Sequence, residues 1–521
     1  MHLELENIFT SQLPADSNET NETRQVLNAC FSYVFPRIPS NPKLIHATEE
    51  VALLIGISKE DLESEDFLNY FSGKKVIPNS RPYAMNYAGH QFGNWAGQLG
   101  DGRAILLTEI KHKDQVFALQ LKGAGSTPYS RRADGLAVLR SSIREHLCSE
   151  SMFHLGVPTT RSLSLILTGD TVLRDVMYDG NSNYEKGAVV CRVAPSFIRF
   201  GNFELFSSQN DVPTLKLLTD FTIKNYFPDI TSDGKEKYLE FFKSVSNKTW
   251  EMIVHWQRVG FVHGVMNTDN MSILGLTIDY GPYGWLEDYN YNWTPNTTDK
   301  EHRRYRFENQ PNVAQWNLYQ LANALFPLIE EAKPLELLLQ EFQQLYHSNY
   351  IDMMCSKLGL KKRDTNDEKL IAKLEKNLQL SETDMTIFFR ELSSVKKNAS
   401  PGSAIATINE AFYKPEEIKK EILKSWENWF EKYLNRLNLE DHSDEERTIA
   451  MNSVNPKYVL RNYMAQVAIE AAEKEDYTIL KELHGLLKNP YEEQAELDKW
   501  YAKRPDWARD KIGSSMLSCS S

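Results

Sequence analysis

Two short segments carry the residue types that bind a divalent metal ion and handle phosphate groups. One runs from His263 to Asn270, and the other is the triplet Asp279-Tyr280-Gly281. Asn270 and Asp279 offer side-chain oxygens, which Mg²⁺ accepts together with water and phosphate oxygens. Because these residues occur together, they favour a metal site. The alternative is two unrelated turns, an Asx turn at Asn270 and a glycine turn after Asp279.

The same segments have the order of a protein-kinase catalytic loop followed by its metal-binding triplet, with one difference. In kinases a catalytic Asp stands five residues before the Asn. Here that position is Val265, which can neither accept a proton nor orient a hydroxyl. Asp269 is the remaining carboxylate beside Asn270 and could act as the base, or it is an exposed loop acid. We interpret His263 as a structural anchor of the loop. The chain is therefore either catalytically silent or uses ATP for different chemistry.

Lys122 and Glu145 have the pattern of a phosphate-holding lysine and its helical partner. Lys122 ends the apolar run that begins at Phe117, and Glu145 lies on the next predicted helix. In kinases such a Lys–Glu pair holds the nucleotide phosphates. The alternative is a lysine that caps a strand and a solvated helix charge.

Glycines and arginines add further candidates for phosphate binding. Gly100-Asp-Gly102-Arg103 precedes a predicted strand, and backbone N–H groups beside glycines can approach phosphate, although Asp-Gly also favours a plain hairpin turn. Arg192 and Arg199 could neutralise a triphosphate, or they are surface arginines. Other arginines make this region locally basic: Arg131, Arg132, Arg140 and Arg144.

The composition is that of a globular protein without a nucleic-acid or membrane role. The 521 residues include 59 Lys+Arg and 71 Asp+Glu, a net charge of −12, which argues against a nucleic-acid binder. The five cysteines are scattered without a CxxC pair, so neither a zinc site nor a disulfide framework is expected. No apolar run is long enough to span a membrane, and the first residues lack a secretory signal. A cytoplasmic protein is the expectation.

Periodicity predicts a strand-rich part followed by a helical part. Short apolar runs predict strands at 104–108, 116–121, 162–167 and 188–193, the first two forming a hairpin. A helix is predicted over 136–155 with Asp134 as its N-cap. Apolar residues at helical spacing predict a long helix at 235–259. Further helices are predicted at 315–332, 334–359, 366–379, 383–394, 415–438, 458–473 and 476–487.

This order predicts an α+β protein with a kinase-like, two-lobed fold, an N-terminal extension and a large helical C-terminal region. We expect a leader segment at 1–80, a strand-rich nucleotide-binding lobe at 81–212, and a helical lobe with the catalytic and metal-binding loops at 213–330. The helical C-terminal region would run over 331–521 and end in a Ser-Cys-Ser-Ser tail.

With these residues assembled, the chain resembles the selenoprotein O family of kinase-like protein adenylyltransferases. The resemblance covers most of the chain and rests on ordered motifs. They are Arg24-Gln-Val26, Tyr87-Ala-Gly-His-Gln-Phe-Gly93, Gln98-Leu-Gly-Asp-Gly-Arg103, Leu121-Lys-Gly-Ala-Gly125, Tyr129-Ser-Arg-Arg-Ala-Asp-Gly135, Gly264-Val-Met-Asn-Thr-Asp-Asn270, Asp279-Tyr-Gly-Pro282, Asn309-Gln-Pro311 and the Ser-Cys-Ser-Ser tail.

The resemblance implies that ATP binds in a flipped orientation and that AMP, rather than phosphate, is transferred to a Ser, Thr or Tyr hydroxyl of a protein. Some family members use UTP with Mn²⁺. By motif, Asn270 and Asp279 would hold Mg²⁺ or Mn²⁺, Asp269 would accept the proton, and Glu145 would pair with Lys122. The nucleotide would be contacted by Gly100, Gly102, Arg103, Lys122, Asp134, Gly135, Arg192, Arg199 and Asp279.

Two alternatives to adenylyl transfer remain open from the sequence: a catalytically silent ATP-binding scaffold and an ordinary phosphotransferase. The tail carries Cys519 in place of selenocysteine, and a redox role for it remains open. Some relatives pair the tail Cys with one in the loop before Asn-Gln-Pro. No cysteine lies between Cys191 and Cys355 here, so that disulfide is not expected.

Overall fold

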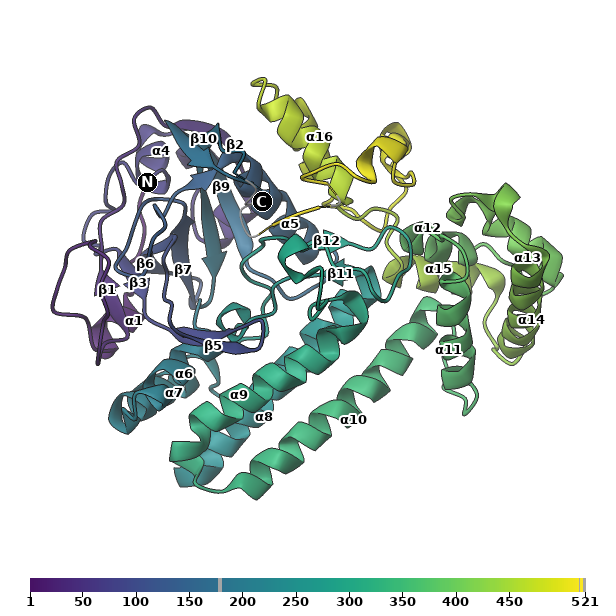
Figure 1. Cartoon of the computed structure of the whole chain (residues 1–521), viewed down its shortest axis with the longest axis horizontal. Coiled ribbons are helices and arrows are strands. Elements are labelled where there is room, and N and C mark those ends of the chain that lie inside the picture. Colours follow the sequence, from purple (N-terminus) through teal and green to yellow (C-terminus); the bar gives the residue numbers. More distant parts are fainter. Residues whose placement is uncertain (177–179, 515, 519–521) are drawn as a thin grey trace.

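An antiparallel sheet occupies one side of the molecule, and helices make up most of the rest (Figure 1). The computed structural model describes residues 1–176, 180–514 and 516–518. The mixed α and β character predicted from the sequence is confirmed. Within the described ranges, no helix is both long and apolar enough to cross a membrane. Cys519 lies outside the described residues.

The sheet has the strand order β1-β3-β6-β7-β10-β9-β2, with β8 paired to β10. Its strands are β1 (Phe31–Tyr33), β2 (Lys43–Ala47), β3 (Tyr83–Met85), β6 (Ala104–His112), β7 (Gln115–Lys122), β8 (Ala137–Val138), β9 (Arg161–Arg174) and β10 (Asn183–Ala194). Two small two-stranded sheets are formed by β4 (Ala88–Gln91) with β5 (Asn94–Gln98), and by β11 (Phe261–Val262) with β12 (Gly284–Trp285). Both ends of the main sheet, β1 and β2, come from the predicted leader segment.

The predicted strands are present, and β6 and β7 form the predicted hairpin. Its turn residues Lys113 and Asp114 have φ values of 48° and 63°. A two-residue turn with positive φ at both positions matches the right-handed twist of the flanking strands. Lys122 is the last residue of β7 and lies at the end of the hairpin opposite this turn.

The prediction that Asp134 caps the following helix was wrong. The helix α5 spans Leu139–His154, and Val138 is its N-cap. Residues 137 and 138 instead pair with β10, and this tertiary pairing prevents an earlier helix start. The Asp134 carboxylate accepts a hydrogen bond from the Leu136 nitrogen and forms an ion pair with Arg174.

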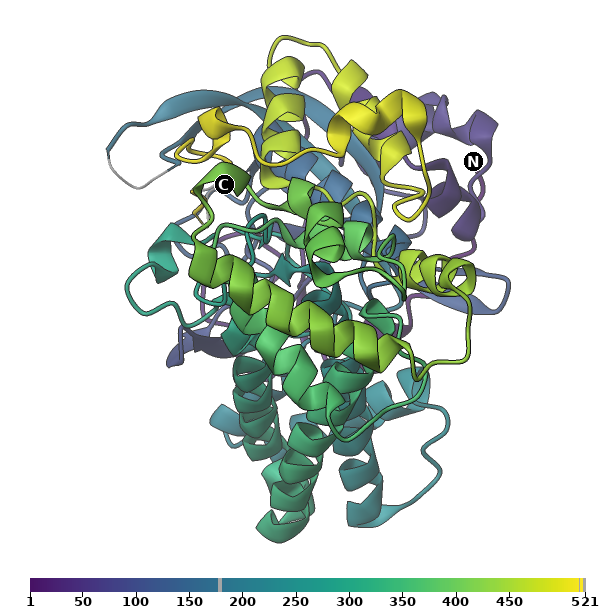
Figure 2. The same cartoon turned by 90° about the vertical axis from the view of Figure 1, so that its right-hand side faces the viewer.

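Four short helices precede the sheet core, and larger ones follow it. The early helices are α1 (Ile8–Gln12), α2 (Glu49–Leu54), α3 (Lys59–Leu62) and α4 (Glu65–Phe71). After the sheet come α6 (Phe200–Ser208), α7 (Val212–Tyr226), α8 (Gly234–Val259), α9 (Gln310–Ile329), α10 (Ala332–Lys357), α11 (Asp367–Leu378), α12 (Met385–Leu392), α13 (Pro401–Thr407), α14 (Lys420–Leu437), α15 (Asp444–Val454), α16 (Asn462–Ala472) and α17 (Thr478–Leu486). Of these, α6 and α13 were not predicted from the sequence. Figure 2 looks onto α11–α15 from the side opposite the sheet.

Helix α8 confirms the long helix predicted at 235–259 from the spacing of apolar residues. Its apolar residues face α9 and α10, which lie beside it (Figure 1). Thr249, the weak position on that face, is buried, and its hydroxyl donates to the Val245 carbonyl at 2.8 Å. Gly260 ends the helix with φ 73°, a conformation that glycine adopts without strain. The catalytic-type loop begins immediately afterwards, so α8 sets the position of that loop.

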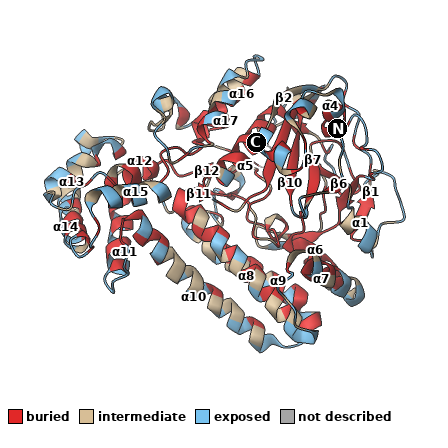
Figure 3. Cartoon of the chain, turned by 180° about the vertical axis from the view of Figure 1, so that it is seen from behind, coloured by how far each residue is buried: buried red, intermediate tan, exposed pale blue. Residues whose placement is uncertain are grey.

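Helix α5 lies between the sheet and the C-terminal helices. It contacts β9 and β10 on one side and α16 and α17 on the other. Figure 3 shows that α5 and the central strands are largely buried, whereas α10 and α13 are more exposed. This central helix carries Glu145.

Candidate active site

A cavity of 710 Å³ opens between the sheet and the loops that follow α8. Nine of the predicted site residues line it: Gly100, Gly102, Arg103, Lys122, Asp134, Arg192, Asp269, Asn270 and Asp279. They come from the turn before β6, the end of β7, the segment before α5, β10 and the two loops after α8. Residues predicted from separate motifs are thus brought to one site.

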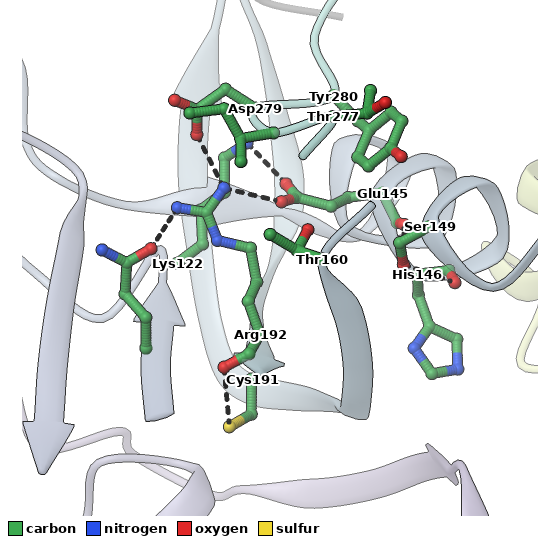
Figure 4. A network of polar contacts seen from close by, with 12 residues as sticks. Lys122, Glu145, His146, Ser149, Thr160, Cys191, Arg192, Thr277, Asp279 and Tyr280 are labelled. Carbon is green, nitrogen blue, oxygen red and sulfur yellow. Dashed lines mark hydrogen bonds and ion pairs between the residues drawn. The ribbon is translucent and has the colours of Figure 1, made fainter. Parts of the chain in front are cut away.

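A buried network of ion pairs forms one wall of the cavity (Figure 4). Lys122 Nζ lies 2.5 Å from Glu145 Oε2, the pair predicted from the sequence. Arg192 Nη1 lies 3.0 Å from Glu145 Oε1 and 2.6 Å from Asp279 Oδ1. Arg199 Nη1 lies 2.5 Å from Asp279 Oδ2. Arg192 is therefore shared between the two carboxylates, and the surface-arginine alternative is excluded for both arginines because each is buried.

Strand register explains why Lys122 and Arg192 meet. In the β7–β10 pairing, Lys122 is opposite Val190 and Arg192 is opposite Gln120. Side chains two residues apart on a strand, and those opposite each other, share one face of a sheet. Gln120, Lys122 and Arg192 therefore lie on the same face, where α5 presents Glu145. The Gln120 amide oxygen also accepts a hydrogen bond from Arg192.

Asp279 is held as an anion. Burial alone would raise the pKa of its carboxyl, but Arg199, Arg192 and Lys122 outweigh that effect and hold the pKa well below its ordinary value. The backbone at Asp279 has φ 57°, a left-handed conformation that costs a non-glycine residue free energy. His263 steadies the segment because its buried Nε2 donates to the Ile278 carbonyl at 2.8 Å, the anchoring role interpreted from the sequence.

Asp269 is a buried acid with one carboxylate oxygen that is unpaired in the part of the chain that the structure describes. Its side chain is 7% exposed, which excludes the exposed-acid alternative. Oδ2 accepts a hydrogen bond from Gln91 Nε2 at 3.1 Å, whereas buried Oδ1 has no partner among the described residues. Burial raises the pKa of Asp269 to about 7, although the Gln91 hydrogen bond and Arg199 oppose the rise. A carboxylate with a pKa near neutrality is suited to general-base chemistry.

The β4–β5 hairpin holds the loop that carries Asp269. The backbone nitrogen of His90 donates to Thr268 Oγ1 at 2.7 Å, and that of Phe92 donates to Asn267 Oδ1 at 3.2 Å. Arg199 Nη1 donates to the Asp269 carbonyl at 2.7 Å from the other direction. The loop is therefore fixed through both its backbone and its side chains.

The residues present fit a hard divalent cation. Asn270 Nδ2 donates to the Val265 carbonyl at 2.8 Å, so the amide oxygen is the atom free to coordinate. Each carboxylate oxygen can accept two interactions, so Asp279 retains lone pairs beyond those that meet Arg192 and Arg199. Both residues line the cavity. An all-oxygen donor set suits Mg²⁺ or Mn²⁺.

Comparison with known proteins decides the family. A family model described as Protein adenylyltransferase SelO matches residues 16–488. The chain belongs to the SelO family. A protein of Flavobacterium johnsoniae named Protein nucleotidyltransferase YdiU is 65% identical over 520 residues, which cover 100% of both chains. Proteins of the same name from Rhodopirellula baltica and Aromatoleum aromaticum are 52% and 50% identical, over 100% of this chain and 99% and 100% of theirs. The family predicted from the motifs is confirmed, and the chain is an enzyme of nucleotidyl transfer.

Within this SelO-family site, three predicted residues do not line the cavity. Glu145 and Arg199 lie behind it and act through Lys122, Arg192 and Asp279. Gly135 packs on the neighbouring loop: a Cβ there would stand 2.1 Å from the Gly125 carbonyl oxygen. The structure therefore gives Gly135 a packing role in the segment that leads to α5.

The predicted glycine turn is packed against its neighbour as well as lining the cavity. A Cβ on Gly100 would collide with the Tyr129 ring, and one on Gly102 would stand 2.7 Å from the Tyr129 carbonyl oxygen. The Arg103 side chain follows this turn and has no hydrogen-bond or ion-pair partner in the described part of the chain. Arg103 is thus a cation available to a ligand in the cavity.

Sequence reasoning missed three polar residues of the SelO-family site: Gln91, Asp101 and Gln120. Buried Asp101 lies 3.8 Å from Arg199 and accepts hydrogen bonds from the Met85 nitrogen and Gln120. Gln91 belongs to the motif 87–93, and Asp101 lies between the two glycines, so both stood inside segments already singled out. Their role in the site is evident only from contacts with distant segments, Gln91 with Asp269 and Asp101 with Arg199.

Proposed function

We propose that this enzyme transfers AMP from ATP to Ser, Thr or Tyr hydroxyls of proteins and releases pyrophosphate. The observation that carries the proposal is that one cavity contains both a wall of buried cationic side chains and a separate carboxylate that can accept a proton. Lys122 and Arg192 line this wall, Arg199 stands behind Asp279, and Asp269 has an Oδ1 that is unpaired within the described residues. Buried, preorganised cations stabilise charge that develops on phosphate oxygens. A triphosphate that directs its β- and γ-phosphates toward this wall leaves the α-phosphate open to the acceptor hydroxyl.

The chain's own residues account for each transfer in the step. The substrate hydroxyl oxygen attacks the α-phosphorus, and the bond from that phosphorus to the pyrophosphate oxygen breaks. The hydroxyl proton passes to the Asp269 carboxylate, and the cationic wall receives the pyrophosphate charge. Asn270 and Asp279 would hold a divalent ion, which would further neutralise the phosphate oxygens. Val265 needs no proton chemistry in this scheme.

The proposal includes a kinase-like, two-lobed arrangement. In it, 81–212 form the nucleotide-binding lobe and 213–330 form the lobe with the catalytic and metal-binding loops, followed by the helical region 331–521. The cavity supports this division, because its walls come from the sheet on one side and from the loops after α8 on the other.

Labelled ATP tests the proposal directly. With a protein acceptor and Mg²⁺ or Mn²⁺, label from [α-³²P]ATP should become covalently bound to protein, and label from [γ-³²P]ATP should not. Asp279→Ala should abolish the transfer. Transfer of the γ-label alone would instead establish a phosphotransferase, and ATP binding without transfer of either label would establish a silent scaffold. A parallel arm with [α-³²P]UTP measures the preference between AMP and UMP.

A further inference from the structure

Three histidines from distant parts of the chain meet away from the cavity. His46 lies on β2, His146 on α5 and His484 on α17. Each offers one ring nitrogen, and these nitrogens all lie within 4.8 Å of one another. His146 and His484 are buried and His46 is half-buried. Within the described ranges, no other group of three His, Cys, Asp or Glu side chains is arranged to hold a metal ion.

One nitrogen–nitrogen distance in the cluster is close to that of a tetrahedral metal site. His46 Nδ1 lies 2.9 Å from His146 Nε2. Two imidazole ligands of Zn²⁺, each about 2.0–2.1 Å from the ion, stand about 3.3 Å apart in tetrahedral geometry. The two rings would separate by only about 0.4 Å to admit the ion. The ring centroids of His46 and His484 are 4.3 Å apart, so the third ligand is already adjacent.

Hydroxyl groups lie beside two of the rings. Ser162 Oγ lies 2.6 Å from His146 Nδ1. When that Nδ1–H donates to the hydroxyl, the lone pair of Nε2 faces His46, which is the arrangement that an outer partner imposes on a metal-binding histidine. Thr48 Oγ1 lies 3.4 Å from His484 Nε2.

Charged side chains of both signs stand beside the cluster. Arg161 adds positive charge near His484 and is itself paired with Glu150 at 2.7 Å. Lys481 and Lys488 add positive charge near His46, and Glu49 opposes it. Lys488 is itself paired with Glu50 at 2.6 Å, so its repulsion of a cation is reduced.

We propose that His46, His146 and His484 bind one Zn²⁺ ion, with water as the fourth ligand. Three neutral imidazoles and one open position are a ligand set that suits zinc. The ion would tie β2, α5 and α17 together, segments that begin at residues 43, 139 and 478. His146 follows Glu145 on α5, and Figure 4 shows the two side chains leaving the helix in different directions. The zinc would therefore bind one side of α5, while Glu145 on another side of the same helix contacts the residues of the cavity.

Zinc titration of the metal-stripped full-length chain tests the proposal. Competition with a chromophoric chelator should show one tight equivalent of Zn²⁺ per chain. Co²⁺ in its place should give the intense visible absorption of a tetrahedral site. His484→Gln should weaken zinc binding by about 100-fold or more and remove the absorption. Zn²⁺ should also raise the Tm of the unaltered chain by a few degrees and leave the Tm of the variant unchanged.

Matched variants separate this site from the rest of the chain. His154→Gln alters another histidine of α5 and should keep the tight equivalent. Asp279→Asn removes a ligand of the cavity and should also keep it, so the result does not depend on the proposed adenylyl transfer. If His484→Gln fails to fold, half-buried His46→Gln serves in its place. If the unaltered chain binds Zn²⁺ no more tightly than His484→Gln or His46→Gln, the three histidines form a hydrogen-bonded cluster and not a zinc site.

Discussion

Gly89 lies directly against Asp269: a Cβ added to Gly89 would stand 3.1 Å from both the Cβ and the backbone nitrogen of Asp269. Such distances are tighter than ordinary van der Waals contact. Gly89→Ala should therefore displace the loop that presents the proposed base while leaving the cationic wall intact. We expect kcat to fall by about 100-fold, because small displacements of a catalytic group are costly.

ATP affinity measured by calorimetry should change little in Gly89→Ala. Gly402→Ala is the control, since a Cβ there meets open space. Equal kcat values for the two variants would show that the hairpin does not position Asp269.

Asp269→Asn should isolate the proton-acceptor step. The amide preserves the size of the side chain but cannot accept the hydroxyl proton, so kcat should fall by about 10²–10⁴ with ATP binding maintained. Single-turnover AMP transfer is the measurement, and exposed Asp229→Asn is the control. A variant that retains the full rate would assign the proton to another acceptor.

Asp279→Asn should destabilise the protein as well as inactivate it. The substitution leaves Arg192 and Arg199 buried without the carboxylate that they share. Removing one partner of a buried ion pair costs about 3–5 kcal/mol, and the lower end applies because the Asp279 side chain is 21% exposed. We expect urea denaturation without nucleotide to show a loss of about 3 kcal/mol.

Added pyrophosphate should restore part of the stability lost in Asp279→Asn, because it supplies anionic oxygens to Arg192 at the cavity wall. Asp220→Asn breaks surface pairs with Lys216 and Lys237 and should cost less than about 1 kcal/mol. A similar loss in both variants would mean that the buried network contributes no more than surface charges.

Glu109 should give the free energy of unfolding a pH dependence. Burial raises the pKa of its carboxyl to about 7 from the ordinary 4.5. Between these values the folded chain keeps a proton that the unfolded chain has released. The free energy of unfolding therefore falls as pH rises from about 4.5 to about 7, by up to about 3 kcal/mol.

Glu109→Gln should remove that slope and be more stable than the unaltered chain at pH 8. Its amide oxygen still accepts the hydrogen bond that Glu109 Oε2 receives from the Phe9 nitrogen at 2.8 Å. Urea denaturation at pH 5 and pH 8 measures the effect, with exposed Glu301→Gln as the control. Parallel pH profiles for the two variants would contradict the prediction.

The sequence predicted those parts of the site that depend on local patterns. Lys122 at the end of an apolar run and Glu145 on a helix were recognisable because each lies at a characteristic place in its own element. The distance between them, 2.5 Å, then followed from the packing of α5 on the sheet. Asn270 and Asp279 were recognisable for the same reason, since their loops follow one helix directly.

Contacts between distant segments could not be predicted in this way. Asp134 had the residue type of a helix cap, but pairing of β8 with β10 delayed the helix start. The amide of Gln91 reaches Asp269 across 178 positions of sequence, and no local pattern records that contact. The histidine cluster is a further example, because its members lie on three elements that only the folded chain brings together.

The strand order also has a consequence for how the protein is made. Both outer strands, β1 and β2, come from residues 31–47, yet β2 pairs with β9, which ends at Arg174. During synthesis the early segment must therefore wait for a partner more than a hundred residues later, and such non-local pairing folds slowly. Removal of residues 1–47 would leave β3 and β9 as the edge strands of the sheet, and exposed edges can template aggregation. With β1 and β2 in place, the sheet instead ends in strands of only 3 and 5 residues, and very short edge strands limit joining of neighbouring copies.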